Sequence, residues 1–254
     1  MSREAAPRVR QRLAGGLHAA AAPAILLLAS CAQAPYVPSA TEPTPGLPVA
    51  EYEAAVRPGD TLYRIDDGAS RILFRVGRAG PMQEMGHDHV VASEAVEGIV
   101  LLASDPGRSR ADLRIPLREL VVDKPAYRAR YGLEPDVPAD VVNGTTRNMQ
   151  EGVLESDEFP WAEVAVRMAS ALNEPPTLAV SITLHGSTFE YLVPAAIETS
   201  GGTLLINGEM TLAHADFGLE PFSAAGGLLR VAENIGVEFE LQARAVKAAE
   251  LAAM

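Results

Sequence analysis

The chain has 254 residues and a net charge of −12, from 21 Lys and Arg against 33 Asp and Glu. Such an acidic surface repels phosphate backbones and anionic headgroups, which excludes nucleic acid as a partner and membrane binding led by charge. Cysteine occurs once, so an intrachain disulfide and a metal site made of several cysteines are also excluded.

The first 30 residues have the three parts of a secretory signal peptide. Four arginines lie between residues 3 and 12, a moderately apolar stretch runs from Leu13 to Leu28, and two small residues precede the cysteine. The strongly apolar part, residues 24–29, is far shorter than the roughly 20 residues that span a bilayer. Removal of residues 1–30 takes away four Arg and one Glu, which leaves 17 basic against 32 acidic residues and a net charge of −15.

Leu28-Ala29-Ser30-Cys31 resembles a bacterial lipobox, in which the cysteine is diacylated after cleavage. The sequence therefore predicts an exported lipoprotein that is anchored to the cell envelope through acyl chains on Cys31 and faces the periplasm. Ala32, rather than an aspartate, follows the cysteine and favours the outer membrane. Five prolines lie between residues 35 and 48, so residues 31–57 are interpreted as a lipidated, Pro-rich tether.

From Thr61 onward, apolar residues alternate with polar ones, which is the period of a half-buried strand. The clearest case is 237–243, where apolar residues alternate with Glu and Gln. His185-Gly186-Ser187 predicts a hairpin turn. Eight or nine strands with short connections predict an antiparallel sheet. The other expected strands cover residues 61–66, 71–76, 96–103, 113–118, 164–168, 178–184, 189–193 and 203–214.

Between Asp123 and Asp157 the alternation stops. Val142, Thr146 and Met149 recur there at helical spacing, which predicts one or two short helices. The rest of the body is all-β, and its strands can close as a barrel or stack as a sandwich. Aromatic residues make up only 5% of the chain, and this scarcity favours a barrel with a hollow interior.

Several segments of the body resemble, in the same order, those of a known family. Met85-Gly86-His87-Asp88-His89 is similar to a Gly-His-Asn-His segment found in one branch of the family. The other segments are Tyr63 to Asp66, Ser70 to Val76, Val96-Glu97-Gly98, Leu154 to Pro160, Ile182 to Gly186, Asp216 to Leu219 and Gly226-Gly227-Leu228. They resemble the YceI-like family of periplasmic, lipocalin-like proteins, and the resemblance runs from about Leu62 to Val246.

This resemblance implies an antiparallel, lipocalin-like β-barrel of about eight strands over residues 58–247, followed by a tail at 248–254. It implies an interior that holds a polyisoprenoid or similar lipid, and it implies no settled reaction. The chain departs from the family at Asn148, where a basic residue or histidine often stands. The candidate ligand contacts are His87, His89, Phe74, Met149 and Phe217.

His87 and His89 are also weak candidates for metal ligands. Residues i and i+2 of a strand share a face, so both imidazoles can meet one metal ion or one phosphate headgroup, with Asp88 on the other face. Zinc takes three or four protein ligands, and His185, in the predicted exposed turn, and His214 are the sequence-distant candidates for a third. The alternative is that His87 and His89 bond to the backbone of a loop. Asp216 is expected to tie the last loop.

The sequence thus favours a lipid carrier or sensor. It contains no recognisable catalytic triad, phosphate-binding loop or acid pair. Two alternatives stay open. One is a metal-dependent envelope enzyme built on His87 and His89. The other is a non-catalytic envelope interaction protein with a solidly packed barrel. The sequence also leaves open whether the barrel forms a homodimer through an exposed strand edge.

Overall fold

The computed structural model describes residues 46–170 and 175–251. The predicted signal peptide, Cys31 and most of the predicted tether lie outside the described residues. Residues 41–254 form one compact unit, and the three buried apolar clusters all lie within it. This part of the chain therefore carries a hydrophobic core of its own.

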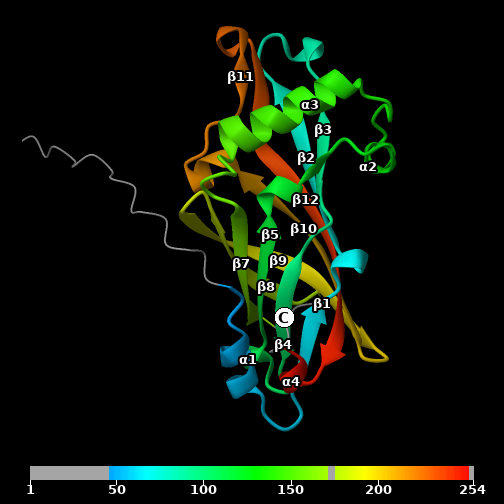
Figure 1. Cartoon of the computed structure of the whole chain (residues 1–254), viewed down its shortest axis with the longest axis vertical. Helices are drawn as coiled ribbons and strands as arrows, with labels where there is room; N and C mark the ends of the chain where they lie inside the picture. Colours follow the sequence, from blue (N-terminus) through cyan, green and yellow to red (C-terminus); the bar gives the residue numbers. More distant parts are fainter. Residues whose placement is uncertain (1–45, 171–174, 252–254) are drawn as a thin grey trace, which may run out of the picture. The chain divides into compact units, whose positions relative to one another are not determined.

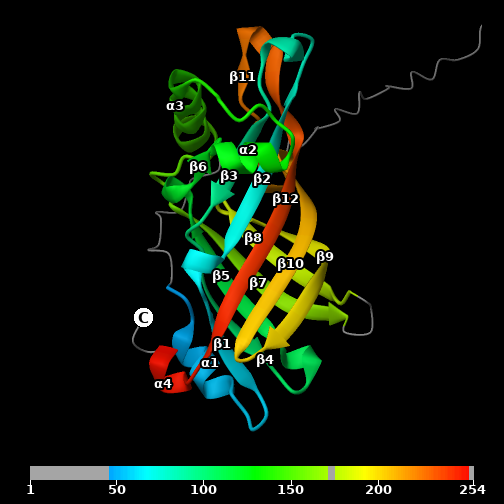
Figure 2. The same cartoon turned by 90° about the vertical axis from the view of Figure 1, so that its right-hand side faces the viewer.

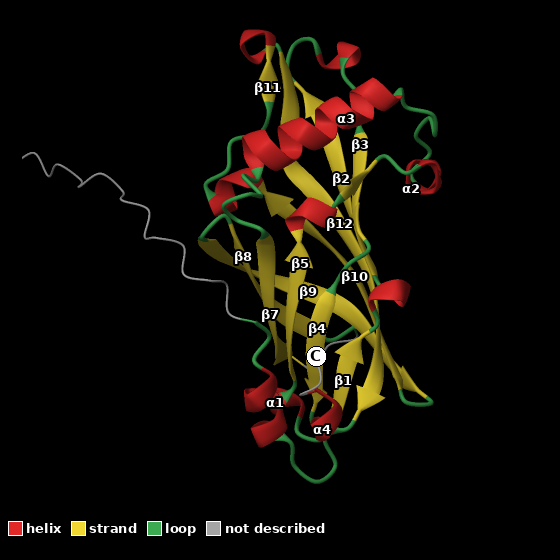
Figure 3. Ribbon diagram, in the orientation of Figure 1, coloured by secondary structure: helices red, strands yellow, loops and turns green. Residues whose placement is uncertain are grey.

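The unit is made of strands with a few short helices (Figures 1 and 3). The described helices are α1 (Val49–Ala55), α2 (Pro125–Arg130), α3 (Ala139–Arg147), the π-helix η5 (Asn148–Val153) and α4 (Ala248–Leu251), besides short 3₁₀ turns. The described strands are β1 (Thr61–Ile65), β2 (Arg71–Ala79), β3 (His89–Ser93), β4 (Glu97–Leu102), β5 (Arg110–Pro116), β6 (Val121–Val122), β7 (Trp161–Ser170), β8 (Thr177–Leu184), β9 (Ser187–Ser200), β10 (Thr203–Ala213), β11 (Ser223–Ala224) and β12 (Leu229–Val246).

Eight of these strands close into a barrel. In order around the ring they are β1, β4, β5, β7, β8, β9, β10 and β12, and β12 pairs with β1 to complete it. Every pairing in the ring is antiparallel. The predicted fold, an all-β, antiparallel, lipocalin-like barrel of about eight strands, is confirmed.

Strand β12 has 18 residues and two partners along one edge. Near its C-terminal end Ala243 pairs with Ile65 of β1, and nearer its N-terminal end Val237 pairs with Phe74 of β2. β2 pairs in turn with β3, and β3 with β6, so a branch of three strands extends the wall. Figure 2 shows β2 and β12 running side by side toward the upper end, where β11 and the β2–β3 loop lie.

The hairpin that joins β8 to β9 turns where the sequence predicted. Leu184 pairs with Ser187 across the turn, and the two residues between them have positive φ, 51° at His185 and 74° at Gly186. A two-residue turn of type I′ requires this conformation at both positions.

The terminal helices α1 and α4 cover the outer face of β1 and β4. Tyr52 of α1 and Leu251 of α4 are fully buried and form one cluster with Ile99 and Leu101 of β4. Val100, the residue between them, belongs instead to the cluster inside the barrel. β4 is therefore buried on both faces, which explains why its sequence is a continuous apolar run.

Both terminal helices lie in segments that the sequence predicted to be outside the barrel domain. α1 falls within the expected tether of residues 31–57, and α4 falls within the expected tail of residues 248–254. The Tyr52 hydroxyl donates to Asp112 Oδ2 at 2.6 Å, and the Arg110 guanidinium lies 4.4 Å from the centre of the Tyr52 ring. The folded body thus begins before residue 58 and ends after residue 247, because the apolar outer face of β4 has to be covered.

The helical region predicted between residues 123 and 157 is present as α2, α3 and η5. In Figure 1, α3 lies across the upper part of the barrel. The lower part of the barrel is filled by its own side chains, among them Tyr63, Leu204 and Ala243, which are at most 5% exposed. Among the described residues, no helix has the length and apolar character needed to cross a bilayer.

Candidate ligand-binding cavity

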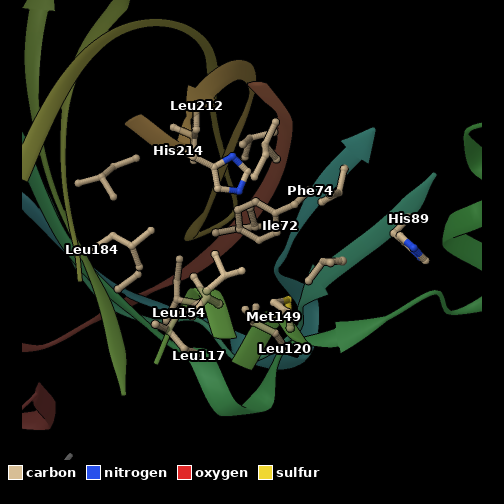
Figure 4. Close-up of a pocket in the computed structure, with 18 of the residues that line it drawn as sticks. Ile72, Phe74, His89, Leu117, Leu120, Met149, Leu154, Leu184, Leu212 and His214 are labelled. Atoms are coloured by element: carbon tan, nitrogen blue, oxygen red, sulfur yellow. The ribbon is translucent and has the colours of Figure 1, made fainter. Parts of the chain in front are cut away.

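The upper part of the barrel encloses a cavity of about 450 Å³. This volume falls within the range of small-molecule binding sites, about 300–1,000 Å³. The wall is made of apolar side chains that alternate inward from the ring and from β2 (Figure 4). They include Ile72, Phe74, Ile115, Leu117, Val164, Val166, Val180, Ile182, Leu184, Ile206, Met210, Leu212, Val237, Phe239 and Leu241.

The helical insertion supplies one side of this cavity. Thr145 of α3 lines it, as do Met149 and Val153 of η5. The amide of Leu154 donates to the Met149 carbonyl at 2.8 Å, five residues back along the chain. A π-helical turn of this kind is rare and is frequent at functional sites. Figure 4 shows Met149 and Leu154 among the side chains that gather around the cavity.

Polar side chains gather where the cavity reaches the surface. Met85 and Phe222 line the cavity and are nevertheless 69% and 38% exposed, so the cavity opens beside them. Arg78, His87 and Arg230 line the same end, and both His87 and Arg230 are exposed. These five residues are named the mouth. The cavity is therefore apolar inside, with basic and polar groups at its opening.

His89 is held from behind by a buried ion pair. Its Nδ1 donates to Asp123 Oδ2 at 2.6 Å, because an ionised carboxylate can only accept. Arg128 Nη1 and the Val90 amide donate to Asp123 Oδ1 at 2.8 and 2.9 Å. Burial alone raises the pKa of Asp123, but these three hydrogen bonds outweigh it and hold the pKa below its ordinary value. With Nδ1 engaged, Nε2 of His89 is the imidazole nitrogen left for a ligand.

A second histidine lies within the wall. His214 is 7% exposed and lines the cavity. Its Nδ1 donates to the Glu233 carbonyl at 2.9 Å, since a carbonyl oxygen can only accept. Figure 4 shows His214 among the apolar side chains and His89 apart from them. The imidazole is thus a fixed polar group in an otherwise apolar part of the wall.

A family model for the YceI-like domain matches residues 63–243, which is more than half of the chain. The chain belongs to the YceI-like family. One similar solved structure is that of Burkholderia cenocepacia BcnA, with 13% identity, a TM-score of 0.52 and coverage of 70% of this chain and 98% of that chain. Another is a polyisoprenoid binding domain from Saccharophagus degradans implicated in plant cell wall breakdown, with 15% identity, a TM-score of 0.50 and coverage of 72% and 98%. No curated protein sequence matches this chain.

Four of the five predicted ligand contacts line the cavity of this YceI-like barrel. Phe74 comes from β2, Met149 from η5, His89 from the first position of β3, and His87 from the loop before it. The sequence predicted that the two histidines share one face of a strand. They do not, because β3 begins only at His89. Their ring centres are nevertheless 6.3 Å apart. Asp88 between them is not among the lining residues.

Phe217 lies elsewhere. It is not among the lining residues, is 2% exposed and belongs to a separate buried cluster. Its ring centre is 6.5 Å from that of Tyr191, whose hydroxyl donates to Asp216 Oδ2 at 2.5 Å. Asp216 thus ties this loop to β9, as expected. Phe217 does not line the cavity itself, but it packs in a cluster with Leu178, Val180 and Ile182, which do.

Among the described histidines, His185 and His214 do not complete a metal site with His87 and His89. His185 is 25% exposed rather than fully solvated, and its Nε2 lies 2.6 Å from Glu155 Oε2. His214 is bonded to a backbone carbonyl. In the described parts of the chain, no three His, Cys, Asp or Glu side chains lie close enough together to hold a metal ion.

The ion pair behind His89 was not foreseen from the sequence. Asp123 is 34 positions from His89, at the edge of the helical insertion, and no local pattern connects the two. Asp123 also has a φ of 54°, a conformation that only a few non-glycine residues adopt. Arg128 is only 4% exposed, although arginine on a short helix ordinarily faces solvent.

Proposed function

We propose that this protein is a carrier or sensor that binds an apolar ligand, a polyisoprenoid or similar lipid, in the barrel cavity. On this proposal it acts by binding and not by catalysis. The observation that carries the proposal is an apolar cavity of about 450 Å³ that opens at the mouth, beside basic and polar side chains. The Saccharophagus degradans domain, whose fold this chain shares and which is described as polyisoprenoid binding, supports the same class of ligand.

Such a wall can hold a prenyl chain with few directed contacts. Each CH₂ group moved from water into apolar surroundings contributes about 0.8 kcal/mol. Ten such groups contribute about 8 kcal/mol, which corresponds to a dissociation constant of about 1 μM before the entropic cost of binding. The basic and polar residues of the mouth then face the polar end of the ligand, with its chain inside.

The two alternatives that the sequence left open receive less support. A metal-dependent enzyme built on His87 and His89 lacks a third protein ligand among the described residues. An interaction protein with a solid interior is at odds with the cavity. Neither is proposed here.

Filling the cavity tests the binding proposal. Val166 and Ile206 line it from β7 and β10, whereas their neighbours Arg167 and Leu205 are exposed on the outside. The double variant Val166→Trp/Ile206→Trp in residues 41–254 is compared with Arg167→Trp/Leu205→Trp. Native mass spectrometry detects any co-purifying ligand, and titration with geranylgeraniol measures the binding affinity.

We expect the inner pair of tryptophans to remove the co-purifying mass and to weaken geranylgeraniol binding by at least about tenfold. The outer pair is expected to leave both unchanged, and circular dichroism checks that both variants are folded. A wild-type barrel without any bound mass and without affinity for the prenol contradicts the proposal. Equal loss in both variants also contradicts it.

We further propose that the protein is exported and lipid-anchored through Cys31, on the periplasmic side of the cell envelope, with the outer membrane favoured. This proposal is based on the resemblance of residues 1–30 to a signal peptide and of Leu28-Ala29-Ser30-Cys31 to a lipobox. The test is Cys31→Ser in the full chain, followed by metabolic labelling with palmitate and membrane fractionation. The variant is expected to lose the label and to leave the membrane fraction. Retention of the label in the variant would rule out this anchor.

A further inference from the structure

Two loops at the upper end of the barrel carry an exposed apolar patch. The loops are residues 80–86 and 222–228, and together they are named the tip. Half of the eight large hydrophobic side chains that are exposed among the described residues lie here. They are Met82 (37% exposed), Met85 (69%), Phe222 (38%) and Leu228 (42%). A cluster of this kind on a soluble surface marks an interaction site.

The two loops of the tip are fixed to each other. The Met82 amide donates to the Leu228 carbonyl at 2.9 Å. Gly80 has a φ of 96°, and a Cβ there would lie 2.6 Å from the same carbonyl oxygen, so only glycine allows this approach. Ala79 and Arg230 pair at the base of the tip. Figures 1 and 2 both show this end projecting beyond α3. The apolar patch therefore sits on a defined structure.

The patch is continuous with the interior of the barrel. Met85 and Phe222 belong both to the exposed patch and to the cavity lining. Met82 and Leu228 belong to the patch alone, because they are not among the lining residues. An apolar ligand that enters the protein from lipid at the tip therefore contacts the apolar patch first and then the apolar side chains of the cavity.

The charges near the tip neither attract nor repel a neutral surface. Arg78 Nε lies 3.7 Å from Asp88 Oδ1, and Arg78 Nη2 lies 4.0 Å from Glu84 Oε2. Arg230 lines the same opening, so two positive charges stand against two negative ones and largely cancel. The chain as a whole carries −12, which disfavours anionic membranes. The partner that fits an apolar patch with balanced charge on an acidic protein is a zwitterionic lipid surface.

We propose that the tip docks onto a lipid bilayer and that apolar ligands pass between the bilayer and the cavity there. This rests on the proposed function, because it names the surface from which the ligand is taken. Docking inserts the side chains of Met82, Met85, Phe222 and Leu228 among the lipids and places the basic and polar residues of the mouth, Arg78, His87 and Arg230, against the headgroups.

Flotation of residues 41–254 with phosphatidylcholine vesicles, at low and at high salt, tests the docking. The tip variant is Met82→Asp/Leu228→Asp, which spares every residue that lines the cavity. The matched control is Leu192→Asp/Leu205→Asp, two exposed leucines (69% and 36%) on β9 and β10. In a second measurement, geranylgeraniol is supplied in detergent micelles, and its binding is measured without a bilayer.

We expect wild type and control to float at both salt concentrations and the tip variant to partition at least about tenfold less. All three are expected to bind geranylgeraniol from micelles equally well. A tip variant that floats like wild type overturns the docking proposal. So does a wild type that fails to float, or that floats at low salt only. Loss of micelle-delivered binding in the wild type instead refutes the proposed function, which separates the two failures.

Discussion

Arg128 Nη1 donates to Asp123 Oδ1 at 2.8 Å, and both side chains are almost completely buried. Removing the charge of Asp123 leaves Arg128 buried without a counter-ion and leaves His89 without the acceptor that orients it. We expect Asp123→Asn to lower the free energy of unfolding by about 3–5 kcal/mol. Urea denaturation measures it.

The control for this variant is Glu94→Gln. Glu94 pairs with Lys124 at a position where both side chains are at least 40% exposed, so its loss should cost no more than about 1 kcal/mol. Similar costs for the two variants would mean that the buried pair contributes no more than a surface pair does.

The same carboxylate gives a pH dependence. The pKa of Asp123 is lower in the folded protein than in the unfolded chain, so the folded state is stabilised above the ordinary pKa, about 4. This stabilisation is lost as the pH falls through the folded-state pKa. Between about pH 6 and about pH 3 the wild type should lose more stability than Asp123→Asn does. Urea unfolding at both pH values tests it, and parallel losses would contradict it.

Met149 tests the apolar character of the cavity on its helical side. Met149→Leu conserves volume and polarity, and we expect it to keep geranylgeraniol affinity within about threefold. Met149→Glu places a carboxylate in the apolar wall and should weaken the same binding by at least about tenfold. Fluorescence titration measures both. Unchanged affinity in Met149→Glu would show that the ligand does not contact η5.

Tyr52 tests whether α1 belongs to the folded body. Burial, together with the hydrogen bond to Asp112, raises the pKa of Tyr52, so the hydroxyl stays protonated and donates. Tyr52→Phe loses one hydrogen bond, at a cost of about 1 kcal/mol. Tyr52→Ala leaves a cavity beneath α1, at a cost of about 3–5 kcal/mol. Equal urea midpoints for wild type and Tyr52→Ala would mean that α1 does not pack on β4.

Alternation predicts the strands that have one solvent-exposed face. Residues 237–243 alternate because inward residues such as Val237 line the cavity while Glu238 and Glu240 face outward. β3 could not be found this way. Val91 belongs to the interior cluster, while Val90 and Ala92 on the other face are fully buried, so alternation is absent from its sequence. α1 was missed for a related reason, since it is short and directly follows a proline-rich segment, and its apolar face has no evident partner until the outer face of β4 is known to be buried.

The candidate site could be predicted only in part. Phe74 could be predicted because it lies on the inward face of a strand whose apolar and polar residues alternate. The partners of His89 could not be predicted, because Asp123 and Arg128 are brought to it by a turn and a helix that leave no periodic pattern in the sequence. Phe217 shows a further limit, since a sequence does not tell which side of a loop a buried aromatic ring faces.

The π-helix η5 gives the helical side of the cavity an adjustable register. Its turn holds one residue more than an α-helical turn, and its middle residues Glu151 and Gly152 are exposed. Deleting one residue there restores α-helical spacing and turns Met149 by about 100° against Val153. On the proposed function, single-residue changes in this one turn therefore alter how deep a ligand sits in the cavity.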